Sequence, residues 1–336
     1  MPDGMRARFF DPFTALDHPV SVFVAVLAAA VLVGFPMTAL LLRRTGRLDA
    51  ETAARAMSRW RAWLLMALCV AIPLILGTAW TMAAVALFSL ACYGEFARVT
   101  GLFREKFISA VVVLSILIVT FAVFDHYDRL FFATAALGSG LVAIAALWGD
   151  RPQGYVQRLA LGVLGFLLFG FSLGYLGNFA NDANYRPILC MLVLAPVLSD
   201  VAGAAGGRLM KGPCLLPKTR PGWTVSGAVA ALVITTLAVA AMGWFIFVDT
   251  PMGHPGHLLF LGFLVAALSQ LGVFVVAAIK ADVGVPGTGA ILPGYGGLLD
   301  RFDSLVLIPP AVFHYLSLVL GPMWRAQPER IITGGL

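Results

Sequence analysis

Long apolar stretches alternate with short polar segments along most of the chain. Ten such stretches occur, at about 19–42, 62–77, 79–97, 107–124, 130–148, 159–177, 187–206, 223–248, 258–279 and 304–323. An α-helix needs roughly 20 apolar residues to cross the hydrocarbon core of a bilayer. The runs are continuous and do not alternate in period two, which disfavours a β-barrel. The pattern predicts an all-α polytopic membrane protein with about ten transmembrane helices.

The composition supports this class and excludes several others. The chain is 60% hydrophobic and 12% charged, and its mean hydropathy is +0.92. A soluble domain carries roughly twice that charge. The four cysteines include no C-x-x-C pair and the five histidines show no ligand spacing, so neither a metal cluster nor a disulfide framework is predicted. No basic stripe with interleaved aromatics is present, so nucleic acid is not an expected partner.

The distribution of basic residues predicts an orientation. If the segment after the first helix is cytoplasmic and the chain then alternates, 17 of the 23 Lys and Arg fall on the inside. Cytoplasmic loops are enriched in these residues. We therefore expect a multi-pass protein of the cell inner (cytoplasmic) membrane with both termini outside. The polar, helix-prone segment at 44–61 is expected to form an interfacial amphipathic linker, with Trp60 and Trp63 at the headgroup level.

Two glycine-rich loops on the predicted cytoplasmic side are long enough to build a site. In the first, residues 198–227, Asp200 comes before the end of its apolar stretch. An acidic residue at membrane depth is a functional candidate. Arg208 and Lys218 add positive charge to the same loop. For these two cations the tendency of inside loops to be basic is an alternative explanation.

The second loop, residues 279–305, contains the sequence LPGYGGLLDRFDS at 292–304. Asp300 and Asp303 are three positions apart and would share a face at the start of the last helix. Two carboxylates at the membrane surface could hold Mg²⁺ together with substrate phosphates. The alternative is that an aspartate at a helix start only caps the helix.

Other residues of the second loop are suited to binding an anion. Gly296 and Gly297 would leave backbone N–H groups free near a helix N-terminus, which favours phosphate. Arg301 and Lys280 could bind phosphate oxygens. Lysine at the end of a membrane helix also commonly extends to the interface without any such role.

The segment PGYGGLLDRFDS, residues 293–304, closely resembles the C-terminal signature of the phosphatidate cytidylyltransferases (CDP-diacylglycerol synthases), P-G-H-G-G-x-x-D-R-x-D-S. The loop at 198–227 resembles the segment of that family that begins D-S-G-A-Y, and YGEFARVTG resembles its E-(W/F)-x-x-L-x-G helix. The resemblance covers about residues 59–325. Residues 1–58 would be an added transmembrane helix with its linker, and 326–336 a short tail.

The resemblance implies an activity, cofactors and partners. The family makes CDP-diacylglycerol and pyrophosphate from CTP and phosphatidate in a cytidylyltransferase-type membrane bundle. It uses Mg²⁺, with or without a second cation, and the resemblance also implies a homodimer. It implies that Asp300 is a metal ligand and that Lys280 and Arg301 bind phosphate, while Asp303 holds the loop or assists the metal. The implied substrate-binding residues are Asp200, Arg208, Lys218, Gly296, Gly297 and Ser304.

The chain also departs from the family pattern. Val273 stands where the family has the aspartate that is the partner metal ligand, and valine offers no oxygen to Mg²⁺. Asp282 or Asp200 could substitute for it. Further departures are Gly287 for an aspartate, Tyr295 for the signature histidine and Trp223 for a lysine.

Two interpretations of these departures remain open. One is an active cytidylyltransferase with a rearranged site. The other is a divergent paralogue with little or no transferase activity that binds lipid or a partner lipid enzyme. A transporter is a weaker hypothesis, because the apolar stretches contain few charges and no paired discontinuous segments.

Overall fold

The computed structural model describes residues 9–289, 296–321 and 330–334. Within them, ten helical segments are long and apolar enough to cross a membrane, which confirms the predicted class. They are α2 (Pro19–Arg44), α3 (Ala50–Leu76), α4 (Thr78–Thr100), α5 (Lys106–Phe124), α6 (Asp128–Ala146), the run α7 (Tyr155–Gly165), η3 (Phe166–Ser172) and α8 (Leu173–Phe179), α9 (Tyr185–Met210), α10 (Val225–Ile246), α11 (Pro255–Val283), and the run α12 (Leu299–Phe302), η5 (Asp303–Val306) and α13 (Ile308–Leu320). Shorter elements are η1 (Phe13–Leu16), η2 (Leu102–Arg104), η4 (Pro251–Gly253), and the antiparallel pair β1 (Cys214–Leu216) and β2 (Arg220–Thr224).

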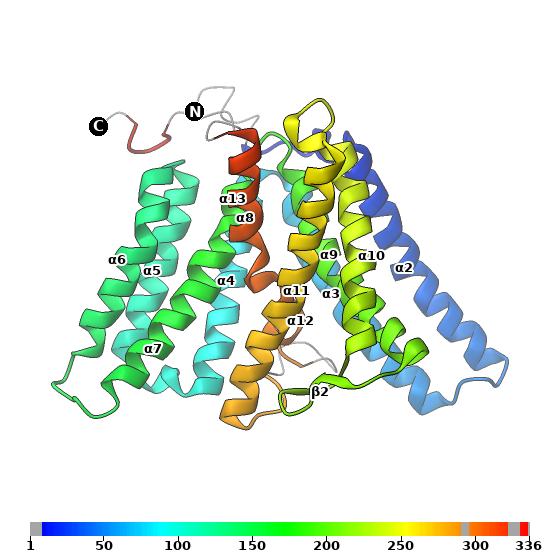
Figure 1. Cartoon of the computed structure of the whole chain (residues 1–336), viewed down its shortest axis with the longest axis horizontal. Coiled ribbons are helices and arrows are strands. Elements are labelled where there is room, and N and C mark those ends of the chain that lie inside the picture. Colours follow the sequence, from blue (N-terminus) through cyan, green and yellow to red (C-terminus); the bar gives the residue numbers. More distant parts are fainter. Residues whose placement is uncertain (1–8, 290–295, 322–329, 335–336) are drawn as a thin grey trace.

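The helices stand side by side and the chain passes back and forth between two ends of the bundle (Figure 1). The start of α2 and the end of α13 lie at one end. The β1–β2 hairpin, η2, the α6–α7 connection and the end of α11 lie at the other, which we call the hairpin end. The segments predicted to be cytoplasmic are thus gathered at the hairpin end, as alternation requires.

The segment at 44–61 does not form a separate interfacial helix, so that prediction is wrong. Asp49 accepts a hydrogen bond from the Thr52 N–H at 2.9 Å and starts α3, which continues to Leu76 without a break. Trp60 lies against the middle of α2, where its Nε1–H donates to the Leu32 carbonyl at 2.8 Å. Pro36 has no N–H to give that carbonyl, so the indole replaces a missing helical bond.

The last membrane segment is interrupted, and its polar residues lie deeper than the sequence predicts. A Cβ at Gly272 would lie 2.6 Å from the Asp303 carbonyl oxygen, so only glycine permits this close approach of η5 to α11. Gly272 precedes the end of α11 by about 16 Å at 1.5 Å per residue. The chain therefore turns back into the bundle before α13. The hydroxyl of Ser172, at the end of the π-helical segment η3, donates to the Val306 carbonyl exposed by this interruption.

Helices α9 and α10 approach closely at the hairpin end through glycines. A Cβ at Gly206 would lie 2.4 Å from the Ala230 Cβ, and one at Gly227 would lie 2.6 Å from the Gly203 carbonyl. Small residues allow such contact between membrane helices. This packing fixes the β1–β2 hairpin, which joins α9 to α10, and the ring of Trp223 on β2 contacts Phe274 of α11.

Candidate active site

A carboxylate from α4 anchors the loop that precedes α12. Glu95 is fully buried. Its Oε1 accepts from the Leu298 N–H at 2.8 Å, and its Oε2 accepts from the Leu299 N–H at 2.8 Å and from the Thr288 hydroxyl at 3.0 Å. A Cβ at Gly297 would lie 2.6 Å from Oε2, so glycine is needed there. Glu95 thereby fixes both ends of the loop to α4.

The Asp300 carboxylate is also fully engaged by the protein. Lys280 Nζ lies 2.9 Å from Oδ1, and both side chains are largely buried. Oδ2 accepts from the backbone N–H groups of Thr288 at 2.9 Å and Gly297 at 3.1 Å. Charge-assisted bonds of this kind are stronger than neutral ones. The Gly297 N–H, a candidate for phosphate binding, is therefore used by Asp300 in this structure.

Two glycines give Asp300 its position. A Cβ at Gly287 would lie 3.0 Å from Asp300 Oδ2, and one at Gly296 would lie 3.3 Å from the same atom. Gly296 has a φ of +95°, a conformation that side chains disfavour. Gly287 is one of the departures from the family pattern, and the Asp300 carboxylate lies against the position where the family carries an aspartate side chain.

The residues around Asp300 do not fit the metal ion that the family resemblance implies. Val273, at the position of the partner ligand, is a buried apolar side chain on α11. Both Asp300 oxygens already accept bonds, and the cation beside them is the Lys280 ammonium. Mg²⁺ needs several oxygen ligands in near-octahedral geometry. In the described parts of the chain, no group of three or more His, Cys, Asp or Glu could hold a metal.

A second acidic pair, Asp200 and Asp303, brings the two predicted loops together. Asp303 is 5% exposed, and the hydrogen bond to its side chain in the described structure comes from the Ser304 N–H at 2.9 Å. The acidic group acting on it is Asp200 on α9, not Asp300, and the nearby cations are Arg220 and Lys280. Asp200 is exposed and interacts electrostatically with Arg220 and Arg301. Asp200, Asp303 and these three cations form what we call the charged cluster.

Trp223 on β2 positions one cation of the charged cluster. Its ring fills the space beside Gly203, where a Cβ would lie 2.4 Å from the indole. The Arg220 guanidinium lies over the same ring, 4.9 Å from its centroid. At the position where the family has a lysine, this chain therefore has Trp223, whose ring makes a cation–π contact with Arg220.

Two buried hydrogen-bond donors of this region have no partner within the described residues, the Trp223 Nε1–H and the Ser304 hydroxyl. Unsatisfied buried donors are rare in folded proteins and call for an explanation. Each is a donor without an acceptor among the described residues, and this agrees with the prediction that Ser304 binds substrate.

Other predicted site residues are not brought to these groups. Arg208 and Lys218 are exposed, at the end of α9 and between the two strands, and within the described residues neither is bonded to Asp300 or Asp303. Asp282 is also exposed near the end of α11. Tyr295 lies outside the described residues. Their predicted roles stay predictions.

Glu95 is the functional candidate that residue-by-residue reasoning missed. The signal for it was present, because it is an acidic residue within the apolar stretch 79–97, and such residues are functional candidates. It also belongs to YGEFARVTG, the segment that resembles a family motif. The sequence did not reveal its partner, since Leu298 is 203 positions away.

The fold and site define a polytopic membrane protein in which charged groups from α4, α9, β2, α11 and the last membrane segment meet at the hairpin end. A sequence model of the cytidylyltransferase family matches residues 57–319, so the chain belongs to the cytidylyltransferase family. The resemblance found in the signature is thereby confirmed.

Individual relatives agree with this assignment. The uncharacterized protein YnbB of Escherichia coli is 27% identical over 310 residues, which cover 90% of this chain and 98% of that protein. The phosphatidate cytidylyltransferase of Helicobacter pylori is 33% identical over 144 residues, 43% of this chain and 52% of that protein. That of Rickettsia typhi is 23% identical over 212 residues, 62% of this chain and 89% of that protein.

Proposed function

We propose that the protein is a membrane nucleotidyltransferase that makes CDP-diacylglycerol and pyrophosphate from CTP and phosphatidate, as a step in phospholipid biosynthesis. The observation that carries the proposal is the charged cluster, in which two loops about 100 residues apart in sequence meet around Asp200 and Asp303. Family membership and the relatives named as phosphatidate cytidylyltransferases support the same reaction.

The reaction requires the protein to position CTP and the lipid phosphate and to neutralise their negative charge. An oxygen of the lipid phosphate attacks the α-phosphorus of CTP, a P–O bond forms, and the bond from that phosphorus to the bridging oxygen breaks as pyrophosphate leaves. Catalysis of such transfer rests on alignment and electrostatic stabilisation. Arg220, Arg301 and Lys280 supply positive charge, and Ser304 supplies a donor. Asp300 and Glu95 hold the loop, and no step is assigned to a metal at Asp300.

We further propose that the hairpin end faces the cytoplasm of a cell whose inner membrane holds the protein. The excess of Lys and Arg in the segments at that end supports this orientation. It would give the charged cluster access to cytosolic CTP and to phosphatidate in the inner leaflet. Dimerisation remains a prediction from the family resemblance.

The alternative is a divergent paralogue with little or no transferase activity that binds lipid or a partner lipid enzyme. One observation favours it. The carboxylate that the family uses for metal is closed off here by Lys280, Thr288 and Gly297, and its partner position is Val273.

A direct assay separates the two. Purified protein in mixed micelles is given labelled CTP, phosphatidate and a divalent cation, and CDP-diacylglycerol and pyrophosphate are measured. We expect both products in equal amounts. We expect Arg301→Gln to lower kcat/KM about 100-fold, the size typical of losing one charge-stabilising group. The matched control is Arg47→Gln, which removes an exposed arginine from the α2–α3 connection. No product from the wild-type protein would favour the paralogue.

A further inference from the structure

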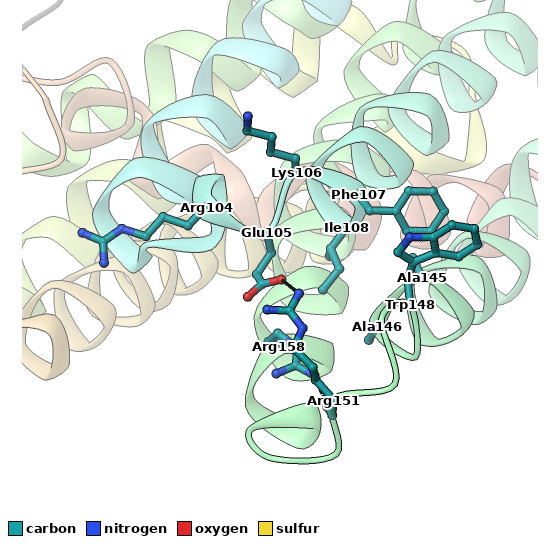
Figure 2. Close-up of a pocket in the computed structure, with 10 residues that line it drawn as sticks. All are labelled: Arg104, Glu105, Lys106, Phe107, Ile108, Ala145, Ala146, Trp148, Arg151 and Arg158. Carbon is teal, nitrogen blue, oxygen red and sulfur yellow. Dashed lines mark hydrogen bonds and ion pairs between the residues drawn. The ribbon is translucent and has the colours of Figure 1, made fainter.

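A cavity of about 240 Å³ lies at the hairpin end, apart from the charged cluster. It is bounded by the end of η2 and the start of α5, by the end of α6, and by the loop and first turn of α7 (Figure 2). Its lining includes Arg104, Lys106, Arg151 and Arg158. None of the residues that line it belongs to the candidate active site, and the proposed reaction does not use them.

The charge of this cavity is unbalanced. Four cations and one carboxylate, Glu105, line the cavity, and Glu105 Oε2 lies 3.3 Å from the Arg151 guanidinium. Arg104 and Lys106 are exposed and have no ion-pair partner among the described residues. The residues that line the cavity therefore have a formal net charge of +3, from four cations and one carboxylate.

Part of this basic lining is held in place by the protein. Arg158 donates from Nη1 to the Gln153 carbonyl at 2.7 Å and from Nη2 to the Arg151 carbonyl. These bonds tie the α6–α7 loop to the first turn of α7. Figure 2 shows Arg151 and Arg158 next to Glu105, with the ion pair that joins the loop to the start of α5. Cations that only obey the charge asymmetry of membrane loops need no such framework.

An apolar surface adjoins the basic lining. The rings of Phe107 and Trp148 stack with centroids 4.6 Å apart, and they are 44% and 68% exposed. Ile144 and Leu147, on the last turns of α6, are more than half exposed as well. Aromatic side chains at the ends of membrane helices typically lie at the level of the lipid headgroups. The cavity thus offers a charged part and a lipid-facing part side by side.

We propose that this cavity binds the phosphate-bearing headgroup of an anionic phospholipid, at a site separate from the catalytic one. Basic pockets between membrane helices bind such headgroups, and Lys and Arg near the membrane surface attract anionic lipids. A soluble anion would bind to the cations alone and would make no use of the apolar surface. The stacked Phe107 and Trp148 add contact with the glycerol and upper acyl region, which only a lipid has.

The test is lipid retention measured by native mass spectrometry. Full-length protein in detergent is titrated with equal amounts of phosphatidylglycerol and phosphatidylcholine of the same acyl chains. We expect wild-type protein to retain phosphatidylglycerol at least about tenfold better than phosphatidylcholine. The double variant Arg104→Gln with Lys106→Gln is expected to lose this preference, because it removes two of the four cations of the lining.

The matched control removes two arginines from the same end of the bundle. Arg43 and Arg44 are exposed on the last turn of α2, and Arg43→Gln with Arg44→Gln takes away the same charge. It should keep the preference for phosphatidylglycerol. An equal loss in both double variants would mean that only the general positive field attracts lipid, and it would overturn the proposal.

Two further arms distinguish a lipid from a free anion. Trp148→Ala should weaken phosphatidylglycerol retention several-fold while both charge and the thermal unfolding midpoint stay unchanged. Inorganic phosphate at about 10 mM, where charges are only weakly screened, should not displace the bound lipid. Displacement by phosphate, or no effect of Trp148→Ala, would identify a soluble-anion site and overturn the proposal.

Discussion

Two pairs of carboxylates lie near the hairpin end, and they differ in how well the protein satisfies them. Glu95 and Asp300 each accept bonds from three donors, including the Lys280 ammonium. Asp200 and Asp303 act on each other as like charges, and Asp303 has a hydrogen bond from the neighbouring Ser304 N–H. The first pair is bonded into the fold, whereas the second has fewer hydrogen bonds from the described residues.

From this difference we infer a structural role for Asp300, which the signature resemblance implies to be a metal ligand. Asp300 is the more conspicuous residue in DRFDS, but its oxygens already accept hydrogen bonds from Lys280, Thr288 and Gly297. A carboxylate whose bonds are all satisfied contributes to stability, whereas one left near a like charge is the better candidate for work on a substrate. Stability and activity should therefore respond to different members of the two pairs.

The largest effect on stability is expected from Glu95→Ala. It leaves three donors without an acceptor, two of them backbone N–H groups inside the bundle, and each such loss costs about 1–3 kcal/mol. The free energy of unfolding in detergent should fall by about 3 kcal/mol or more. Glu51→Ala is the control, since Glu51 makes only an exposed pair with Arg55 at 4.0 Å, worth about 0.5 kcal/mol. Similar small changes in both variants would contradict an anchoring role for Glu95.

A comparable loss is expected from Asp300→Ala, because it leaves the Lys280 ammonium unpaired in a largely buried place, at a cost of about 3 kcal/mol. Removing both partners, with Asp300→Leu and Lys280→Met, should cost much less than the sum of the single losses. A double-mutant cycle of unfolding free energies measures the coupling. Coupling near zero would show that the pair does not form in solution.

The same variants test the metal. Mn²⁺ binding, followed by electron paramagnetic resonance, should have the same affinity in wild-type protein and in Asp300→Asn, because Asp300 is already neutralised by Lys280. A clear loss of Mn²⁺ affinity in Asp300→Asn would restore Asp300 to the metal-binding role that the family resemblance implies.

Asp303→Asn should show the opposite profile. Asparagine can still accept the Ser304 N–H, and the change removes a buried charge next to Asp200, so we expect stability to change by less than about 1 kcal/mol. Under the proposed function, CDP-diacylglycerol formation should fall about 100-fold, because Asp303 helps to position Arg220 and Lys280, and misplacing such groups costs rate of that size. Glu51→Gln, which changes an exposed carboxylate at the start of α3, is the control. If Asp303→Asn lowers stability as much as Asp300→Ala, the distinction between the two pairs fails.

Much of the fold was predictable, for a simple physical reason. A membrane helix needs about 20 apolar residues, and that length is visible in one dimension. The predicted break between the stretches 62–77 and 79–97 is confirmed at Gly77, whose φ of +122° in the structure suits glycine. The segment 44–61 was mispredicted because its polar side was taken for a headgroup-facing surface. In the structure the Trp60 indole N–H donates to the Leu32 carbonyl, which Pro36 cannot bond because proline has no N–H.

The site was predictable as a set of residues and not as an arrangement. The two glycine-rich loops and Asp200, Asp303 and Lys280 stood out because charge is scarce in this chain. Their partners did not, because bonds such as that of Glu95 to Leu299 join positions 204 apart. Periodicity placed Asp300 and Asp303 on one helical face, but α12 ends at Phe302 and η5 begins at Asp303. The interruption sends the two carboxylates to different partners.

The smallest expected effect concerns Asp125, a hydrogen-bonded carboxylate at the end of the bundle opposite the hairpin end. Asp125, between α5 and α6, accepts from the Ile332 and Thr333 N–H groups and from the Thr333 hydroxyl. Burial would raise its pKa, but the bonds from Thr333 and the adjacent backbone outweigh this and lower the pKa below the ordinary value of 3.8. Since the folded pKa is depressed, the stabilisation is present above the ordinary pKa and is lost as the pH falls through the lowered one.

Residues 330–334 should therefore stay docked on Asp125 at pH 5 and be released only in stronger acid. Hydrogen exchange of the Ile332 and Thr333 amides, corrected for the intrinsic effect of pH, measures this release. In Asp125→Asn the protection should be weaker at pH 5 and should not change further on acidification, because the amide has no charge to lose. Protection that is the same in both proteins across the pH range would mean that the Asp125 charge does not hold the segment, and that satisfied carboxylates in this protein are not all stabilising.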